Sequence, residues 1–134
     1  MGLTRATTLA DLARATLEGV AFQVGDLIEA MSADLGQPLA DFRVDGGMAR
    51  SEPFLQLQSD ILGFPITRSP QSESTALGAA LLAGLGANLW NDAATALALI
   101  EENGRRFTPN VADAARSRAL ARWQKAVELV VARG

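Results

Sequence analysis

The sequence contains no cysteine and no histidine among its 134 residues. Without cysteine the chain can form neither disulfides nor thiolate zinc sites, and this composition fits a reducing compartment, so we expect a cytoplasmic protein. Without histidine the chain lacks the commonest general base, which excludes Ser-His catalytic triads and imidazole metal sites. Composition alone therefore rules out two common classes of catalytic and metal site.

Positive charge is also scarce. The 12 Lys and Arg residues are scattered and are outnumbered by 15 Asp and Glu, which gives a net charge of −3. This balance argues against nucleic acid or an anionic membrane as the main partner. The longest uncharged apolar run, residues 75–89, is too short and too rich in glycine for a membrane span, and the N-terminus lacks the pattern of a signal peptide. Hydrophobic residues make up 49% of the chain, which suits one domain with its own core.

The most informative stretch is residues 42–51, FRVDGGMARS. Alternating apolar residues predict a short strand over 42–45, Gly46 and Gly47 end it, and Ser51 is typical of a helix N-cap. A Gly-Gly turn between a strand and a helix lets the backbone approach a ligand, because no Cβ intervenes. Two alternatives stay open. Asp-Gly can form a hairpin turn, although helical spacing follows it, and the glycines can serve loop geometry alone.

Helices and a second strand are predicted around this turn. A capping box at Thr8 begins a long amphipathic helix that ends at Gly36. The apolar stripe of this helix consists of Leu9, Leu12, Thr16, Val20, Val24, Leu27, Met31 and Leu35. Another helix runs from Ser51 to about Leu62, and residues 64–68 form the second strand. Strand, helix and strand over this distance predict a right-handed parallel βαβ unit.

Residues 73–84 predict a helix that is apolar on every side and is made of small residues. A helix without a polar face is typical of a buried position, so we expect it to lie in the core. Glu73 begins this helix, where its carboxylate can accept hydrogen bonds from backbone N–H groups.

Three further segments complete the predicted elements. A short helix is capped at residues 91–92 and ends at residues 103–104. Residues 105–110 are extended, and a last helix covers about 111–131. Trp123 in that helix is predicted to be a packing anchor whose indole N–H lies near the surface.

Several motifs in order along the chain resemble one known family. The motifs are VDGG at 44–47, LQSDILG at 57–63 and ESTALGAA at 73–80, with further matching stretches at 2–5, 15–18, 106–109 and 123–127. Together they resemble the C-terminal half of the FGGY carbohydrate kinases, most closely the glycerol kinase branch, over essentially the whole chain. The resemblance implies an actin-like ATPase (ribonuclease H-like) architecture. We therefore expect an α/β fold that is mostly helical with a small parallel sheet.

The resemblance also implies a binding site for ATP. In the family the Gly-Gly turn lies against the bound nucleotide, near the adenosine and the α-phosphate. Gly46, Gly47 and Ser51 are therefore the predicted nucleotide contacts, with Met48 and Arg50 as weaker candidates. Glycerol kinases often carry Asn at the position of Ser51. The serine side chain is shorter than asparagine, and Ser51 also suits the N-cap role.

By the same resemblance, residues 1–134 are the nucleotide-side fragment of a two-domain kinase that binds ATP and Mg²⁺ between its domains. The γ-phosphoryl group would pass to glycerol or a related polyol, held by the N-terminal domain. The phosphate-binding loops, the sugar-binding residues, the catalytic Asp and a β-meander of the second domain would precede residue 1. The chain alone is therefore expected to be inactive, with no catalytic residue or metal ligand of its own, and Asp45 is interpreted as a turn residue.

Two other functions stay open at this point. One is another sugar kinase of the family, such as a xylulokinase. Those enzymes tend to show three glycines where this chain has Asp45-Gly46-Gly47, which favours glycerol. The other is a non-catalytic nucleotide-binding or interaction module.

The predicted sheet also has a consequence for association. A βαβ unit provides only two strands, which are marginal alone, and the strand at Val44 would be an open edge. The apolar stripe of the long helix would lack part of its partner surface. We therefore expect copies of the chain to form homo-oligomers.

Overall fold

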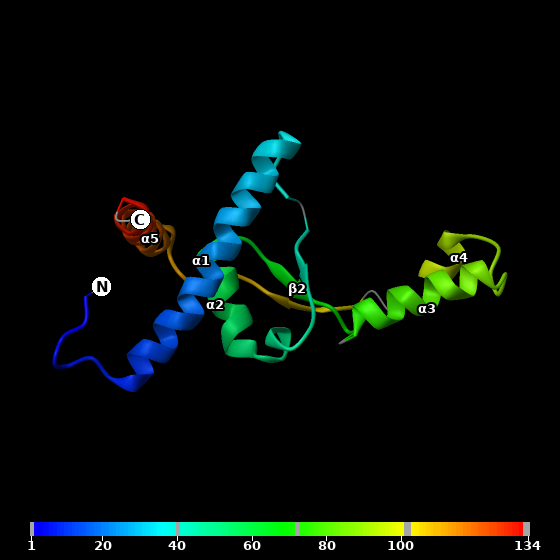
Figure 1. Ribbon diagram of the computed structural model, residues 1–134, viewed down its shortest axis with the longest axis horizontal. Coiled ribbons are helices and arrows are strands. Elements are labelled where there is room, and N and C mark those ends of the chain that lie inside the picture. The colour runs from blue at the N-terminus through cyan, green and yellow to red at the C-terminus, as the bar shows by residue number, and fades with distance from the viewer. Residues whose placement is uncertain (1, 40, 72, 101–102, 133–134) are drawn as a thin grey trace.

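The computed structural model describes residues 2–39, 41–71, 73–100 and 103–132. In chain order the elements are α1 (Leu9–Leu35), β1 (Arg43–Val44), η1 (Met48–Arg50), α2 (Glu52–Leu62), β2 (Ile66–Arg68), α3 (Ser74–Gly86), α4 (Ala93–Leu97), β3 (Arg105–Phe107) and α5 (Asp113–Val131), where η1 is a 3₁₀ helix. Helices α1, α2 and α5 gather around a small sheet, whereas α3 and α4 project away from it (Figure 1). The predicted α/β class with mostly helical content is confirmed. None of the described helices is both long enough and apolar enough to cross a membrane.

The sheet has three strands in the order β1-β2-β3. Strand β1 runs parallel to β2, with Arg43 opposite Thr67, and β2 runs antiparallel to β3, with Ile66 opposite Phe107. The parallel βαβ unit is confirmed, but a sheet of two parallel strands is corrected to a mixed sheet of three. The third strand lies in the segment predicted only as extended. Three residues are too few to show the alternation that would have predicted pairing.

Helix α1 begins as its sequence predicts. The Thr8 Oγ1 accepts a hydrogen bond from the Asp11 N–H at 3.2 Å, and the Asp11 Oδ2 accepts one from the Thr8 N–H at 2.9 Å. The hydrogen bond from the Thr8 N–H is the main reason that the pKa of Asp11 lies below its ordinary value of 3.8. The ionised carboxylate therefore stabilises this cap at neutral pH, and the contribution is lost as the pH falls through the lowered pKa.

Helix α1 packs on α2 through a narrow face. The buried residues of α1 are Ala21, Phe22 and Ile28. Between them Gly25 lies so close to α2 that a Cβ at this position would be 3.6 Å from Leu62 Cδ2. Most of the apolar stripe identified in the sequence lies beside this face and stays open, with Leu9 82% exposed. The packing face of α1 is thus narrower than its apolar surface.

The core lies between α1, α2, the sheet and α5. Its buried members are Ala21, Phe22, Ala49, Phe54, Leu55, Ile61, Ile66 and Phe107. Trp123 of α5 covers one side of this core, because its ring stacks on Phe22 with centroids 5.3 Å apart and planes inclined by 12°. The indole Nε1 donates to Asp26 Oδ2 at 2.8 Å, at an exposed position. The predicted role of Trp123 as an anchor with a near-surface N–H is confirmed.

The LQSDILG motif ties α2 to β3. The hydroxyl of Ser59, which is fully buried, lies 3.1 Å from the carbonyl oxygens of both Phe64 and Phe107. The next residue is Asp60, whose Oδ1 accepts a hydrogen bond at 2.6 Å from the N–H of Asn110 in the segment after β3. The side chains of Ser59 and Asp60 thus supply hydrogen-bond partners for backbone groups outside α2. The motif therefore has a structural role.

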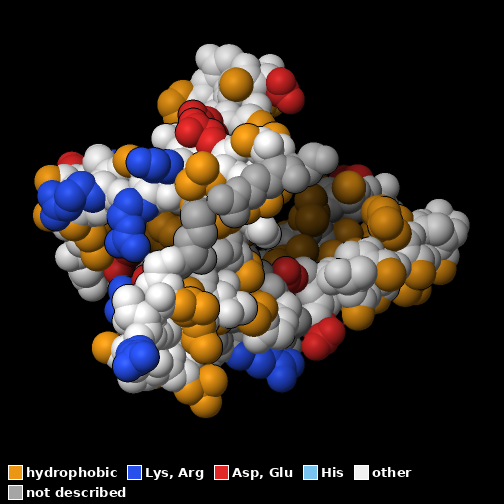
Figure 2. Space-filling model, turned by 60° about the vertical axis from the view of Figure 1, so that its left-hand side comes forward, with side chains coloured by type: hydrophobic (Ala, Val, Ile, Leu, Met, Phe, Trp, Pro, Cys, Tyr) orange, Lys and Arg blue, Asp and Glu red, His pale blue; other side chains and the backbone are white. Residues whose placement is uncertain are grey.

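The α3–α4 hairpin is the main departure from the expected core. Trp90 holds it together, since its Nε1 donates to the Leu81 carbonyl at 3.2 Å and its ring covers Gly84, where a Cβ would clash with the indole. Most of the other apolar side chains of α3 face solvent, and Leu82 is 70% exposed. Figure 2 shows hydrophobic side chains along this projecting arm. The expectation that α3 is buried is therefore wrong for the described chain. Asp92 caps α4 as predicted, but α4 ends earlier than expected.

We predict that Ser59→Ala lowers the free energy of unfolding by about 1–3 kcal/mol, because the buried carbonyl of Phe107 and the partly buried carbonyl of Phe64 lose their shared donor. Chemical denaturation followed by circular dichroism measures this. The matched control is Ser117→Ala on the exposed face of α5, which should change stability by less than about 0.5 kcal/mol. Equal, small effects of both substitutions would contradict the role given to the Ser59 hydroxyl.

Candidate functional site

The two glycines of the turn after β1 have different roles. Gly46 has φ +83, in the left-handed region that other residues rarely adopt. Gly47 has φ −59 and ψ −45, an ordinary helical conformation, and is the N-cap residue of η1, a helix that the sequence did not predict. A Cβ at Gly47 would meet no atom within 4 Å. Loop geometry therefore explains Gly46, whereas neither the backbone nor the described neighbours of Gly47 require a glycine.

Ser51 follows η1 and caps α2. Its Oγ accepts a hydrogen bond from the Phe54 N–H at 3.4 Å, and Pro53 stands in the first turn, where no helical hydrogen bond is lost. The predicted N-cap role of Ser51 is confirmed. Ser51 is also exposed, so it can contact a ligand while its side chain caps α2.

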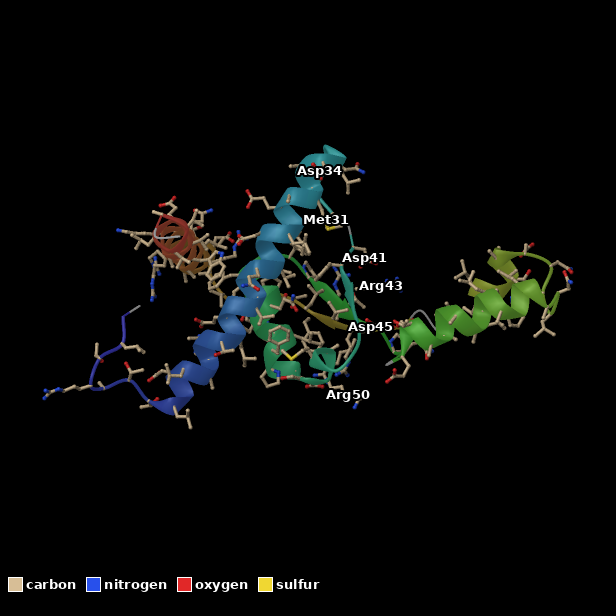
Figure 3. The ribbon with its side chains drawn as sticks, in the orientation of Figure 1. Met31, Asp34, Asp41, Arg43, Asp45 and Arg50 are labelled. Carbon is tan, nitrogen blue, oxygen red and sulfur yellow. The ribbon has the colours of Figure 1, made fainter. Side chains whose placement is uncertain are left out.

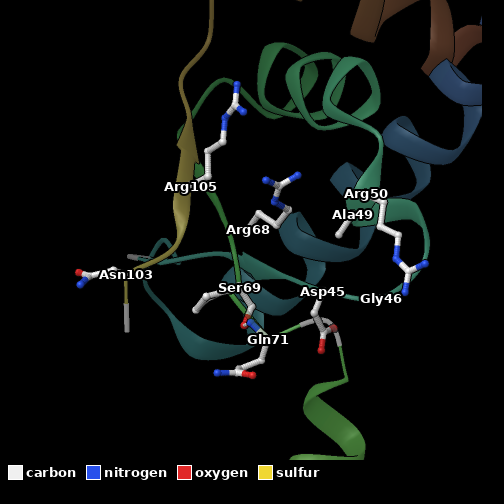
Figure 4. A pocket seen from close by; sticks show the side chains of 10 residues that line it. Asp45, Gly46, Ala49, Arg50, Arg68, Ser69, Gln71, Asn103 and Arg105 are labelled. Atoms are coloured by element: carbon white, nitrogen blue, oxygen red, sulfur yellow. Dashed lines mark hydrogen bonds between the residues drawn. The ribbon is translucent and has the colours of Figure 1, made fainter. Parts of the chain in front are cut away.

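A cleft of about 440 Å³ opens beside the turn. It lies where β1 and β2 end, and the carboxyl ends of parallel strands are where open α/β sheets bind ligands. The residues that line it are Asp45, Gly46, Ala49, Arg50, Arg68, Ser69, Pro70, Gln71, Asn103 and Arg105 (Figure 4). Of the residues predicted to contact a nucleotide, Gly46 and Arg50 line the cleft, whereas Gly47 and Ser51 lie on the flanking backbone.

Three arginines line this cleft, each from a different element: Arg50, Arg68 and Arg105 (Figure 4). Figure 3 shows the place of Arg50 in the whole chain. Two of them share one carboxylate: Arg68 Nη1 lies 3.8 Å from Glu52 Oε1, and Arg105 forms a hydrogen-bonded ion pair with the same oxygen. Arg50 Nη2 lies 3.8 Å from Glu73 Oε1 at the start of α3. Glu73 makes no side-chain hydrogen bond to the backbone of α3, so its predicted capping role is wrong. Its ion pair depends on the tertiary fold, which brings α3 next to η1.

The arginines at positions 68 and 105 were not predicted as part of the site. Arg68 ends the short strand β2, and Arg105 begins β3, 37 residues later by numbering. Only the antiparallel pairing of these strands brings the two side chains to one cleft. Among the described residues, no cluster of three acidic side chains could hold a metal ion.

Comparisons with known proteins agree with this arrangement. Residues 1–87 match the C-terminal domain of the FGGY family of carbohydrate kinases. The chain therefore belongs to the FGGY family of carbohydrate kinases, and the resemblance seen in its motifs is confirmed.

Particular relatives are glycerol kinases. The chain is 50% identical to a glycerol kinase of Dechloromonas aromatica over 95% of its own length and 25% of that protein. For a glycerol kinase of Myxococcus xanthus the identity is 45% over the same shares. The chain thus spans about a quarter of the length of the curated relatives it matches.

Solved structures show the same domain. A Plasmodium falciparum glycerol kinase crystallised with ADP matches with a TM-score of 0.80 and 36% identity, over 96% of this chain and 26% of that one. A xyloylose kinase from Brucella ovis matches with a TM-score of 0.81 and 25% identity, over 99% of this chain and 27% of that one. The backbone is therefore common to kinases named for different substrates, and the sequence identity is higher to the glycerol kinase.

We predict that substitution by alanine changes stability differently at the two glycines of the turn. Gly46→Ala should lower the free energy of unfolding by about 1–2 kcal/mol, because the residue must keep a left-handed conformation. Gly47→Ala should leave stability unchanged or slightly raised, since its backbone is helical and the Cβ has room. Urea denaturation of the two variants tests this pair, and a larger loss at Gly47 than at Gly46 would contradict it.

Proposed function

We propose that residues 1–134 form the nucleotide-side C-terminal part of an ATP-dependent glycerol kinase. Such an enzyme transfers the γ-phosphoryl group of ATP to glycerol and gives glycerol 3-phosphate. The observation that carries the proposal is the identity of about half of the residues with glycerol kinases over 95% of the chain. Asp45 at the start of the Asp-Gly-Gly motif adds support, since xylulokinases tend to carry a third glycine there.

The site offers room and chemistry for a nucleotide. The cleft of about 440 Å³ suits a small ligand. We assign Gly46, Gly47 and Ser51 as nucleotide contacts. Gly47 gives the strongest support for a nucleotide contact, because neither its φ nor its packing against described residues requires a glycine. Bound ATP supplies the phosphoryl group, while this chain contributes the turn that receives the nucleotide.

The remaining assignments of this proposal concern metal, acceptor and assembly. Mg²⁺ is commonly held by substrate phosphates with one or two carboxylates, and we assign no ligand for it within this chain. We place the glycerol site and the catalytic base outside residues 1–134. We also propose that the enzyme is cytoplasmic and that the isolated chain of residues 1–134 forms homo-oligomers, a state that light scattering after size-exclusion chromatography would measure.

We predict that the protein expressed from its complete natural reading frame phosphorylates glycerol, and that the chain of residues 1–134 alone does not. A coupled assay with ATP, Mg²⁺ and either glycerol or xylulose tests both statements. Faster turnover with xylulose than with glycerol would show that the protein is a xylulokinase and not a glycerol kinase. Clear turnover by the 134-residue chain alone would overturn its assignment as a fragment without a catalytic base.

We predict that Gly47→Val in the active protein raises the KM for ATP about tenfold or more, because a new side chain against a tightly bound ligand costs about 1–3 kcal/mol. The KM for glycerol should change much less. The control is Gly19→Val in α1, where a Cβ also meets no atom within 4 Å but the cleft is distant. If Gly47→Val changed both KM values equally while the protein stayed folded, the turn would serve geometry only.

A further inference from the structure

We propose that Arg50 binds a phosphate group of the nucleotide and that Glu73 competes with this phosphate for Arg50. The inference rests on the proposed function, because it requires a nucleotide in the cleft beside Gly46. It assigns a ligand contact to Arg50 and a competing role to Glu73. Arg50 ends η1 and lines the cleft, whereas Glu73 directly precedes α3 and reaches Arg50 through its side chain.

The three arginines of the cleft differ in how firmly they are held. Arg68 and Arg105 converge on Glu52, and Arg68 is partly buried. The pair of Arg50 and Glu73 is long at 3.8 Å, and the two side chains are 72% and 77% exposed. An ion pair between exposed side chains contributes little to stability, because water screens the charges and both side chains lose rotamer freedom. Arg50 can therefore leave its partner at small cost.

The backbone beneath Arg50 is fixed. The preceding residue, Ala49, is buried in the core, and the following residue, Ser51, caps α2. The side chain of Arg50 extends from this anchored position alongside the turn at Gly46 (Figure 4). A long flexible side chain on a fixed base can exchange one anion for another without rearrangement of the turn. Its planar guanidinium offers two parallel N–H donors to a phosphate, which makes the contact stronger than one with a distant carboxylate.

Glu73 carries the same sign of charge as the nucleotide phosphates. Its carboxylate pairs with Arg50, so a phosphate that binds Arg50 must displace it. Once displaced, its carboxylate repels the bound phosphate through solvent. Neutralising Glu73 should therefore strengthen phosphate binding, whereas removing Arg50 should weaken it. If the ion pair between Arg50 and Glu73 serves stability alone, neither change should affect ligand affinity.

Isothermal titration calorimetry of the protein from its complete reading frame tests the proposal, with ADP and adenosine as probes. We expect Arg50→Ala to weaken ADP binding about tenfold, as for the loss of a charge-assisted hydrogen bond, and to leave adenosine binding unchanged. Glu73→Gln should tighten ADP binding about two- to fivefold. Arg106→Ala is the matched control, since Arg106 is exposed on β3 and does not line the cleft.

The outcomes separate this inference from the function on which it rests. If the wild-type protein binds no ADP, both the proposed function and the role of Arg50 are overturned. If it binds ADP and Arg50→Ala binds equally well, only the role of Arg50 fails. Equal weakening of ADP and adenosine by Arg50→Ala would also overturn the proposal, because the guanidinium would then contact the base or ribose. Thermal unfolding of each variant confirms that the fold is retained.

Discussion

Burial of one face of α2 sets the position of the turn and of the cleft beside it. Phe54 and Leu55 pack into the core near the start of the helix, and Ser59 bridges two carbonyl groups further along it. Because Ala49 of η1 joins the same core, the segment between Gly46 and α2 has little freedom. The cleft is lined by η1, by the end of β2, by the start of β3 and by the adjoining loops. Both η1 and β3 contact this buried helix.

The two glycines of the turn differ in what the described structure asks of them. Gly46 supplies a left-handed backbone conformation that allows β1 to end before η1. Gly47 has a helical backbone, and a Cβ there would meet no atom within 4 Å. Loop geometry therefore explains Gly46, whereas a nucleotide contact at Gly47 is our proposal.

Apolar surface on α1 and on the α3–α4 hairpin exceeds what the described residues cover. The chain spans about a quarter of the length of its glycerol kinase relatives. The strands are short and few residues of α1 are buried against α2. The core is therefore small compared with the number of apolar residues in the chain. The polar ties of Asp60 and Trp123 therefore matter, because they fasten β3 and α5 where hydrophobic burial is limited.

The sequence by itself determined the local elements. The capping box at Thr8, the left-handed glycines at Gly36 and Gly63 and the N-cap at Ser51 depend on neighbouring residues only, so spacing and residue type predict them. The motif at the turn likewise lies beside the cleft, which Asp45 and Gly46 line. Tertiary structure alone decided the pairing of β3 with β2, the exposure of α3 and the meeting of distant arginines in one cleft. These features depend on contacts between segments far apart in the chain, and neither periodicity nor capping signals carry information about such contacts.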